Sequence, residues 1–194
     1  PGDRIRLDIE KSKDIDINEI EWKRCDEILE NFYLFDEKIE CDDIKQGNLG
    51  NCYFLSALAA LSEMPVLIYQ IFRTKEENSE GYYEIILFID GQWQIVFVDD
   101  YLPVFKESKD CYFAKPHGNE LWVILLEKAW AKVNGGYANT ISGWPSDPLS
   151  TLTGFATIKL SHKDMKFEDI WKLVSVADKN NNIMCTSTKN DESI

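Results

Sequence analysis

The stretch QGNLGNCYFLSALAAL, residues 46–61, joins a polar loop with two glycines directly to an almost wholly apolar segment. Between Cys52 and Ser62 only Ser56 and the terminal serine are polar, so the pattern predicts a helix over these residues that other elements surround. The first residue of this helix is a cysteine. Backbone N–H groups at a helix N-terminus favour negative charge, and they would therefore favour the thiolate, the nucleophilic form of Cys52.

The loop in front of Cys52 offers a second hydrogen-bond donor. Gln46 lies six residues earlier, and its side-chain amide could point to the same place as the Cys52 backbone N–H. Two such donors would form an oxyanion hole for acyl transfer, with Gly47 and Gly50 keeping side chains away from the approach. The alternative is that Cys52 is a small buried apolar residue and Gln46 a surface residue, which is the usual situation for a cysteine.

The composition is that of a folded domain with a strong acidic excess. With 194 residues, 44% of them hydrophobic, the chain is long enough for one compact domain, or for one domain and an incomplete second. Its formal net charge of -13 opposes binding to nucleic acid or to anionic membranes, and it leaves room for a cation such as calcium. We expect neither a transmembrane segment nor a signal peptide, because no apolar run approaches the roughly 20 residues that span a bilayer.

The five cysteines are an odd number without a Cys-x-x-Cys pair, so they fit neither a disulfide framework nor a zinc site. This usage is typical of a reducing compartment, and we expect a cytoplasmic protein. The cysteines are Cys25, Cys41, Cys52, Cys111 and Cys185.

The hydrophobic pattern predicts one β-hairpin and several more helices. Two β-type runs, residues 82–89 and 93–98, are joined by Asp90, Gly91 and Gln92, and the Asp-Gly step suits a tight turn. The helices are expected within 17–32 with Asn18 as a possible cap, over 65–72, over 119–136 with Asn119 as the cap, and over 166–181. Residues 137–155 are expected to be irregular, and residues 182–194 to begin a new strand.

Four segments resemble, in the right order, segments of the calpain family of cysteine proteases. QGNLGNCYFLSALAAL resembles that family's active-site segment, and EWKRCDEI resembles its entry segment E-W-K-R-P-x-E-I. FIDGQWQIVFVDDYLPV resembles a hairpin ending in V-D-D-x-L-P, and NELWVILLEKAWAKVNGGY resembles a helix with E-F-W-x-x-L-L-E-K-A-Y-A-K. Four ordered segments argue against a chance resemblance.

The resemblance implies an α+β fold, the first half of a papain-like cysteine protease core. The first lobe would be mainly helical, with a central buried helix carrying Cys52 and a small antiparallel β-hairpin, and the second lobe would be absent or only begun. The implied division is an N-terminal arm over residues 1–17, a calpain-like protease subdomain I over 18–184 and the start of a truncated second subdomain over 185–194.

The resemblance also implies roles for single residues. Cys52 corresponds to the nucleophile and Gln46 to the oxyanion donor, while Asp43 and Glu120 match two carboxylates that help to bind a calcium ion. Oxygen ligands from two separate segments suit calcium. The alternative is that Asp43 is a solvated loop acid and that Glu120 complements the dipole at the start of its helix.

Two departures from the family pattern affect the substrate and calcium sites. In ISGWP, which resembles the family's L-S-G-G, Gly143 and Trp144 correspond to the substrate-binding glycines, and the Trp144 ring would crowd a bound peptide. Cys41 stands where the family has an arginine that links the two halves, so the calcium loop is altered.

A thiol protease also needs a histidine base and an Asn or Asp to orient it. In calpains both come from a second half, in segments that resemble G-H-A-Y and R-N-P-W-G, and neither His117 nor His162 matches the first of these. We therefore expect a calcium-dependent-type cysteine endopeptidase that hydrolyses peptide bonds of intracellular proteins through a Cys52 thioester. This chain would be inactive until a second protease subdomain supplies the histidine and asparagine.

Two other hypotheses remain open. The chain could be a non-catalytic, calpain-like binding or scaffold module of a larger protein, which the tryptophan at position 144 favours. It could also be a calcium-binding switch without proteolysis.

Overall fold

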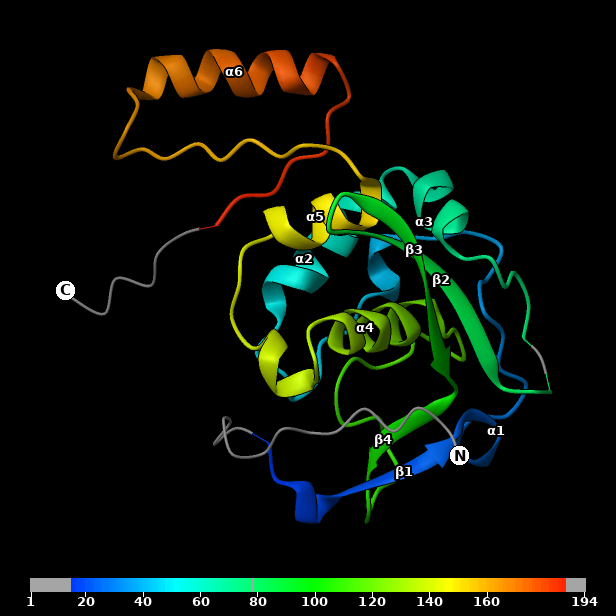
Figure 1. Cartoon of the computed structure of the whole chain (residues 1–194). Helices are drawn as coiled ribbons and strands as arrows, with labels where there is room; N and C mark the ends of the chain where they lie inside the picture. The colour runs from blue at the N-terminus through cyan, green and yellow to red at the C-terminus, as the bar shows by residue number, and fades with distance from the viewer. Residues whose placement is uncertain (1–14, 78, 188–194) are drawn as a thin grey trace. The chain divides into compact units, whose positions relative to one another are not determined.

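The computed structural model describes residues 15–77 and 79–187, which form two compact units (Figure 1). The first unit reaches to Thr157, and the second begins at Ile158. Most of the predicted N-terminal arm lies outside the described residues. Ile15, however, is buried in a core cluster of the first unit.

The first unit mixes helices with short antiparallel strands, in agreement with the expected α+β class. Its helical elements are η2 (Ile17–Glu19), α1 (Cys25–Ile28), η3 (Cys41–Asp43), α2 (Cys52–Ser62), α3 (Pro65–Ile71), α4 (Trp122–Val133), η4 (Tyr137–Thr140) and α5 (Ser146–Thr153). Its strands are β1 (Ile20–Arg24), β2 (Tyr82–Ile89), β3 (Gln92–Asp99) and β4 (Tyr101–Phe105). The second unit contains α6 (Phe167–Lys179).

The predicted hairpin is confirmed by strands β2 and β3, which pair antiparallel from Tyr82 opposite Asp99 to Ile89 opposite Gln92. The turn is shorter than expected, because Gln92 already belongs to β3. Asp90 and Gly91 have φ angles of 51° and 77°, the left-handed pair that a two-residue hairpin turn requires. This explains the Asp-Gly step in the sequence.

The helix predicted within residues 17–32 is largely wrong. Residues 20–24 form strand β1, which pairs antiparallel with β4, and only Cys25–Ile28 are helical beyond it. Asn18 does not cap a helix, since its side-chain amide donates to the Asp16 carboxylate at 3.1 Å. A strand partner far along the chain decided the conformation, which the local spacing of apolar residues does not reveal.

Helix α2 covers the predicted residues and is surrounded by other elements, and α3 follows directly after it. Phe54, Leu58 and Leu61 of α2 are fully buried. Among the described residues no single helix has the length and apolar composition to cross a bilayer. Together α2 and α3 would meet that test, but they are bent by 114° at their junction.

Helix α4 lies at the centre of the first unit (Figure 1). Every side chain from Trp122 to Ala131 is buried. It begins later than predicted, with Leu121 as its N-cap. Asn119 is therefore not the cap, and its side-chain amide instead donates to the Glu30 carbonyl at 2.5 Å. Because α4 is buried on all sides, two adjacent charged residues near its centre, Glu127 and Lys128, lie in the protein interior.

Two ion pairs use the acidic residues at the junction of β3 and β4. The Arg24 guanidinium lies 2.5 Å from the Asp100 carboxylate. The fully buried Lys128 ammonium contacts the Asp99 carboxylate and donates to the Tyr101 carbonyl at 2.5 Å. These contacts join β1 and α4 to the strand junction, so the two acids have structural partners.

The stretch predicted as irregular, residues 137–155, is mostly helical, with η4 and α5 separated by a short loop. Gly154 ends α5 in the left-handed conformation with φ 71°, and its N–H donates to the Ser150 carbonyl at 2.8 Å. The short length of both helices and the proline between them hid this periodicity in the sequence.

In the second unit, α6 confirms the predicted last helix. The rings of Phe167 and Trp171, one turn apart on α6, are stacked with centroids 6.4 Å apart. The strand predicted over residues 182–194 does not form as far as residue 187, and its remaining residues lie outside the described chain.

Candidate active site

Cys52 is the first residue of α2, and its side chain is exposed. The preceding residue, Asn51, is the N-cap, but its side chain makes no capping hydrogen bond. The Asn51 backbone carbonyl accepts from the N–H groups of Phe54 and Leu55 at 2.8 and 3.2 Å. An exposed thiol therefore stands at the N-terminus of a buried helix whose first-turn N–H groups have no side-chain cap.

The loop in front of Cys52 is fixed on two sides. The Asn48 N–H donates to the Tyr112 carbonyl at 2.9 Å, and the Ser142 N–H donates to the Gly50 carbonyl at 2.9 Å. A Cβ at Gly47 would lie 1.7 Å from the Phe113 carbonyl oxygen. Gly47 is thus required for close packing against another segment, whereas the sequence suggested that it clears the approach to the thiol.

Gln46 is held within the same loop. Its side-chain nitrogen donates to the Leu49 carbonyl at 2.8 Å. A primary amide has two N–H groups, so this bond orients the side chain with one of them and leaves the second for another acceptor. Gln46 is therefore fixed within the loop that leads directly to Cys52.

Behind the loop lies a buried carboxylate that the sequence reasoning missed. Glu127 of α4 accepts a hydrogen bond from the Asn51 side-chain nitrogen at 2.7 Å and another from the Ala114 N–H at 2.9 Å. Burial raises the pKa of Glu127 to about 7, against these two hydrogen bonds, which lower it. The available signal was a glutamate within the apolar run of a helix that is buried all round.

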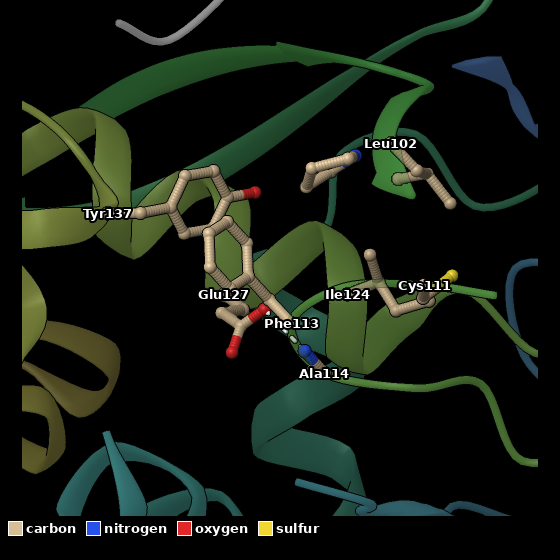
Figure 2. A pocket seen from close by; sticks show the side chains of 8 residues that line it. Leu102, Cys111, Phe113, Ala114, Ile124, Glu127 and Tyr137 are labelled. Carbon is tan, nitrogen blue, oxygen red and sulfur yellow. Dashed lines mark hydrogen bonds between the residues drawn. The ribbon is translucent and has the colours of Figure 1, made fainter. Parts of the chain in front are cut away.

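Glu127 also borders a small interior hollow, lined among others by Cys111, Phe113 and Tyr137 (Figure 2). The hollow has no room for a water-sized molecule. It is therefore not a substrate site, and its dryness explains the desolvation of the Glu127 carboxylate.

Gly143, the first of the two residues expected to bind substrate, packs against the first turn of α2. A Cβ on Gly143 would lie 2.6 Å from the Tyr53 ring, so the glycine backbone packs directly on that ring. The Tyr53 hydroxyl in turn accepts from the Trp130 indole N–H at 3.1 Å. Trp144 follows Gly143 in the chain, and 53% of its surface is exposed.

Asp43 and Glu120, the expected calcium ligands, are both buried. One Asp43 oxygen accepts from the Glu40 N–H at 2.7 Å, and one Glu120 oxygen accepts from the Asp36 N–H at 2.7 Å. Burial raises the pKa of Glu120 to about 7, and the negative charge of Asp43 contributes to the rise. Asp43 is thus not a solvated loop acid, and Glu120 precedes α4 rather than lying in its first turn.

The carboxylate oxygens of Asp43 and Glu120 suit a hard cation such as calcium, but two carboxylates supply fewer oxygen ligands than calcium usually takes. In residues 15–77 and 79–187, no group of three or more His, Cys, Asp or Glu side chains is arranged to hold a metal ion. The His117 ring nitrogen Nδ1 lies 3.9 Å from Asp43 Oδ1 and 2.7 Å from the Asp42 carbonyl oxygen. Calcium would therefore need main-chain carbonyls and water beside these two carboxylates.

The two histidines have partners unrelated to a thiol. His117 belongs to the acidic loop around Asp43, as its contacts there show. In the second unit the His162 ring is stacked on Phe167 with centroids 6.4 Å apart. No disulfide joins any of the five cysteines, all of which lie in the described part of the chain.

Comparison with known proteins identifies a match over nearly the whole chain. Residues 2–194 match the model of the calpain family cysteine proteases. The calpain-type cysteine protease DEK1 of Zea mays is 39% identical over 142 residues, which cover 70% of this chain and 6% of that protein.

Two further relatives agree with this match. The calpain-type cysteine protease ADL1 of Oryza sativa subsp. japonica is 42% identical over 123 residues, covering 63% of this chain and 6% of the relative. The human calpain-1 catalytic subunit is 38% identical over 141 residues, covering 71% of this chain and 20% of the subunit. The matched part of the chain thus spans a fifth or less of the length of these relatives.

Proposed function

Because the chain belongs to the calpain family of cysteine proteases, we propose that it is the nucleophile-bearing half of a papain-like cysteine endopeptidase acting on intracellular proteins. The observation that carries the proposal is the exposed Cys52 thiol at the uncapped N-terminus of the buried helix α2. First-turn N–H groups and the helix dipole favour negative charge at this point, both on the sulfur and on an oxyanion next to it.

The reaction follows from this geometry. The Cys52 thiolate attacks the carbonyl carbon of a peptide bond, and the oxyanion that forms accepts hydrogen bonds from the Cys52 N–H and the second Gln46 N–H. The C–N bond then breaks, and the leaving amine takes a proton from the general acid. Water hydrolyses the resulting thioester, which releases the carboxylic acid and regenerates the thiol.

The reaction also needs a histidine that accepts the thiol proton and later protonates the leaving amine. His117 is engaged with the acidic loop, so we propose that the histidine and its orienting asparagine come from a second protease subdomain. The isolated chain should therefore show no peptidase activity. Five cysteines without a disulfide suit a reducing compartment, and we propose a cytoplasmic protein.

The first test measures the reactivity of Cys52 in the intact chain. Alkylation by iodoacetamide is followed at each cysteine by peptide mass spectrometry, with exposed Cys41 as the internal reference. The neighbouring Asp42 raises the pKa of Cys41, and burial raises the pKa of Cys111 to about 12, so both should react more slowly than Cys52. A Cys52 that is no more reactive than Cys41 would overturn the proposal.

The second test is hydrolysis of a fluorogenic peptide by the chain alone, with Cys52→Ser as the control. No difference between the two proteins is expected. Robust peptidase activity that disappears in the Cys52→Ser protein would refute the assignment of the base to a second subdomain.

We also propose calcium as a ligand of Asp43 and Glu120. A cation there would neutralise two buried carboxylates, and it would offset the burial and the neighbouring Asp43 charge that raise the pKa of Glu120. It would also connect the acidic loop to the start of α4. Calorimetric titration of calcium into the chain should show binding, and Asp43→Ala should abolish it. Equal heats for the two proteins would remove calcium from the proposal, and with it the calcium-switch hypothesis.

A binding or scaffold module is the second candidate, and the exposed Trp144 favours it. If this ring blocks peptides from Cys52, Trp144→Gly should accelerate alkylation by a peptidyl chloromethyl ketone several-fold without changing the rate with iodoacetamide. If the wild-type chain already reacts equally fast with the peptidyl reagent, the ring does not block the site and the protease assignment is retained.

A further inference from the structure

Asn51 occupies the N-cap position of α2, but its side chain makes no capping hydrogen bond. Asparagine is among the most favourable N-cap residues, because its side-chain oxygen accepts from the N–H two or three residues later. In α2 the Asn51 side chain makes no such bond and donates instead to Glu127 at 2.7 Å. Its own oxygen, Oδ1, is buried and has no hydrogen-bond partner within the described chain.

Glu127 is the group that holds Asn51 in this position. Glu127 as a whole is 1% exposed, and its second carboxylate oxygen accepts from the Ala114 N–H at 2.9 Å. The adjoining hollow, seen in Figure 2, has no room for water. A buried carboxylate loses much of its stabilisation when a donor leaves, so Glu127 retains the Asn51 amide strongly.

Release of Asn51 would change the mouth of the helix. Its unpaired Oδ1 would gain a partner by rotating to accept from the N–H of Tyr53, since the Phe54 N–H already donates to the Asn51 backbone carbonyl. That rotation would bring a carbonyl oxygen to the N–H groups beside Cys52. The Tyr53 N–H is one of the first-turn groups that favour negative charge on the sulfur.

We propose that Glu127 is a positioning residue of this protease half, which keeps the mouth of α2 open by holding the Asn51 side chain away from the capping position. Glu127 touches neither the substrate nor the reacting atoms, and it acts through Asn51. The inference rests on the proposed role of Cys52 as the nucleophile.

The test uses a matched pair of substitutions at Asn51. Asn51→Ser and Asn51→Ala both remove the bond to Glu127, but only serine is a favourable N-cap residue. Iodoacetamide alkylation of Cys52 at pH 7 should be about threefold slower in Asn51→Ser than in Asn51→Ala, since capping competes with the thiolate for the same N–H groups. The rate at Cys41, measured in the same samples, should not change.

A second set of variants addresses Glu127 itself. Glu127→Gln can accept from Ala114 and donate to the Asn51 oxygen, so it should react within about twofold of wild type. Glu127→Met releases Asn51 and should slow alkylation of Cys52 about threefold, and adding Asn51→Ala should restore it. If Glu127→Met does not fold, the serine and alanine pair decides the question alone.

Equal rates for Asn51→Ser and Asn51→Ala would overturn the inference, as would a folded Glu127→Met protein with the wild-type rate at Cys52. A double variant no faster than Glu127→Met would also overturn it, because it would mean that the bond only stabilises the loop. Failure of the proposed function would give a different result. In that case Cys52 would be no more reactive than Cys41 in the wild-type chain.

Discussion

Replacing Asp99 by asparagine should destabilise the fold strongly at pH 7 and much less at pH 9. Lys128 is fully buried, and Asp99 supplies the only negative charge in direct contact with its ammonium within the described residues. Desolvation already lowers the pKa of Lys128, and the charge of Asp99 opposes that effect. The substitution keeps a side-chain oxygen that can accept from Lys128 and from the Tyr101 N–H, so it removes the charge with little change of shape.

The destabilisation caused by Asp99→Asn cannot exceed the free energy that Lys128 needs to lose its proton. Removing one partner of a buried ion pair destabilises by about 3 to 5 kcal/mol. The lysine can instead lose its proton, which costs about 4.6 kcal/mol at pH 7 and about 1.9 kcal/mol at pH 9 for an ordinary pKa near 10.4. We therefore expect a loss of about 3 kcal/mol at pH 7 that falls to about 1.5 kcal/mol at pH 9, since a lysine with a depressed pKa regains stability as the pH rises.

The assay is urea unfolding followed by circular dichroism at the two pH values. The double variant Asp99→Asn/Lys128→Met serves as the control, because it removes both charges and should recover to within about 1 kcal/mol of wild type at pH 7. A destabilisation by Asp99→Asn that is the same at pH 7 and pH 9 would refute this account of Lys128. So would a double variant as unstable as the single one.

Three other substitutions test the site and its supports. Glu120→Gln should reduce, by about 2 kcal/mol, the stability that the wild type loses between pH 5 and pH 8 in urea unfolding. A carboxyl with a pKa raised to about 7 favours folding only while it is protonated. Gly143→Ala should lower the free energy of unfolding by about 1 to 3 kcal/mol, since its Cβ would lie 2.6 Å from the Tyr53 ring; an unchanged urea midpoint would contradict this packing. Gly47→Ala should abolish cooperative unfolding, because its Cβ would lie 1.7 Å from the Phe113 carbonyl oxygen, and a normal unfolding curve would show that the loop takes another path.

Parts of the fold that depend on local pattern could be predicted from the sequence. The apolar run after Cys52 is long enough for a helix only, and the Asp90-Gly91 step supplies the two left-handed residues of a hairpin turn. Residues 20–24 could not be assigned in the same way. Their conformation depends on pairing with β4, roughly 80 residues later, and the spacing of Ile20 and Trp22 does not exclude a helix.

In the candidate site, too, features within one segment could be predicted, whereas contacts between distant segments could not. A cysteine at the start of a buried helix could be read from consecutive residues, and so could a nearby glutamine. The hydrogen bond between Asn51 and Glu127 joins residues 76 positions apart, so no pattern within one segment contains it. Gly47 shows the same limit, since the contact that requires a glycine is made with the distant Phe113 carbonyl.

Helix α4 explains why charged residues at its centre serve two different purposes. Successive residues on a helix point about 100° apart, so Glu127 and Lys128 face different neighbours. Glu127 reaches the loop of Cys52 through Asn51, whereas Lys128 reaches the end of the hairpin through Asp99. Breaking the Lys128 pair should therefore reduce global stability while the alkylation rate of Cys52 in the folded protein stays unchanged. Asn51→Ser should instead slow the alkylation of Cys52, so the two variants together separate the support of the fold from the support of the thiol.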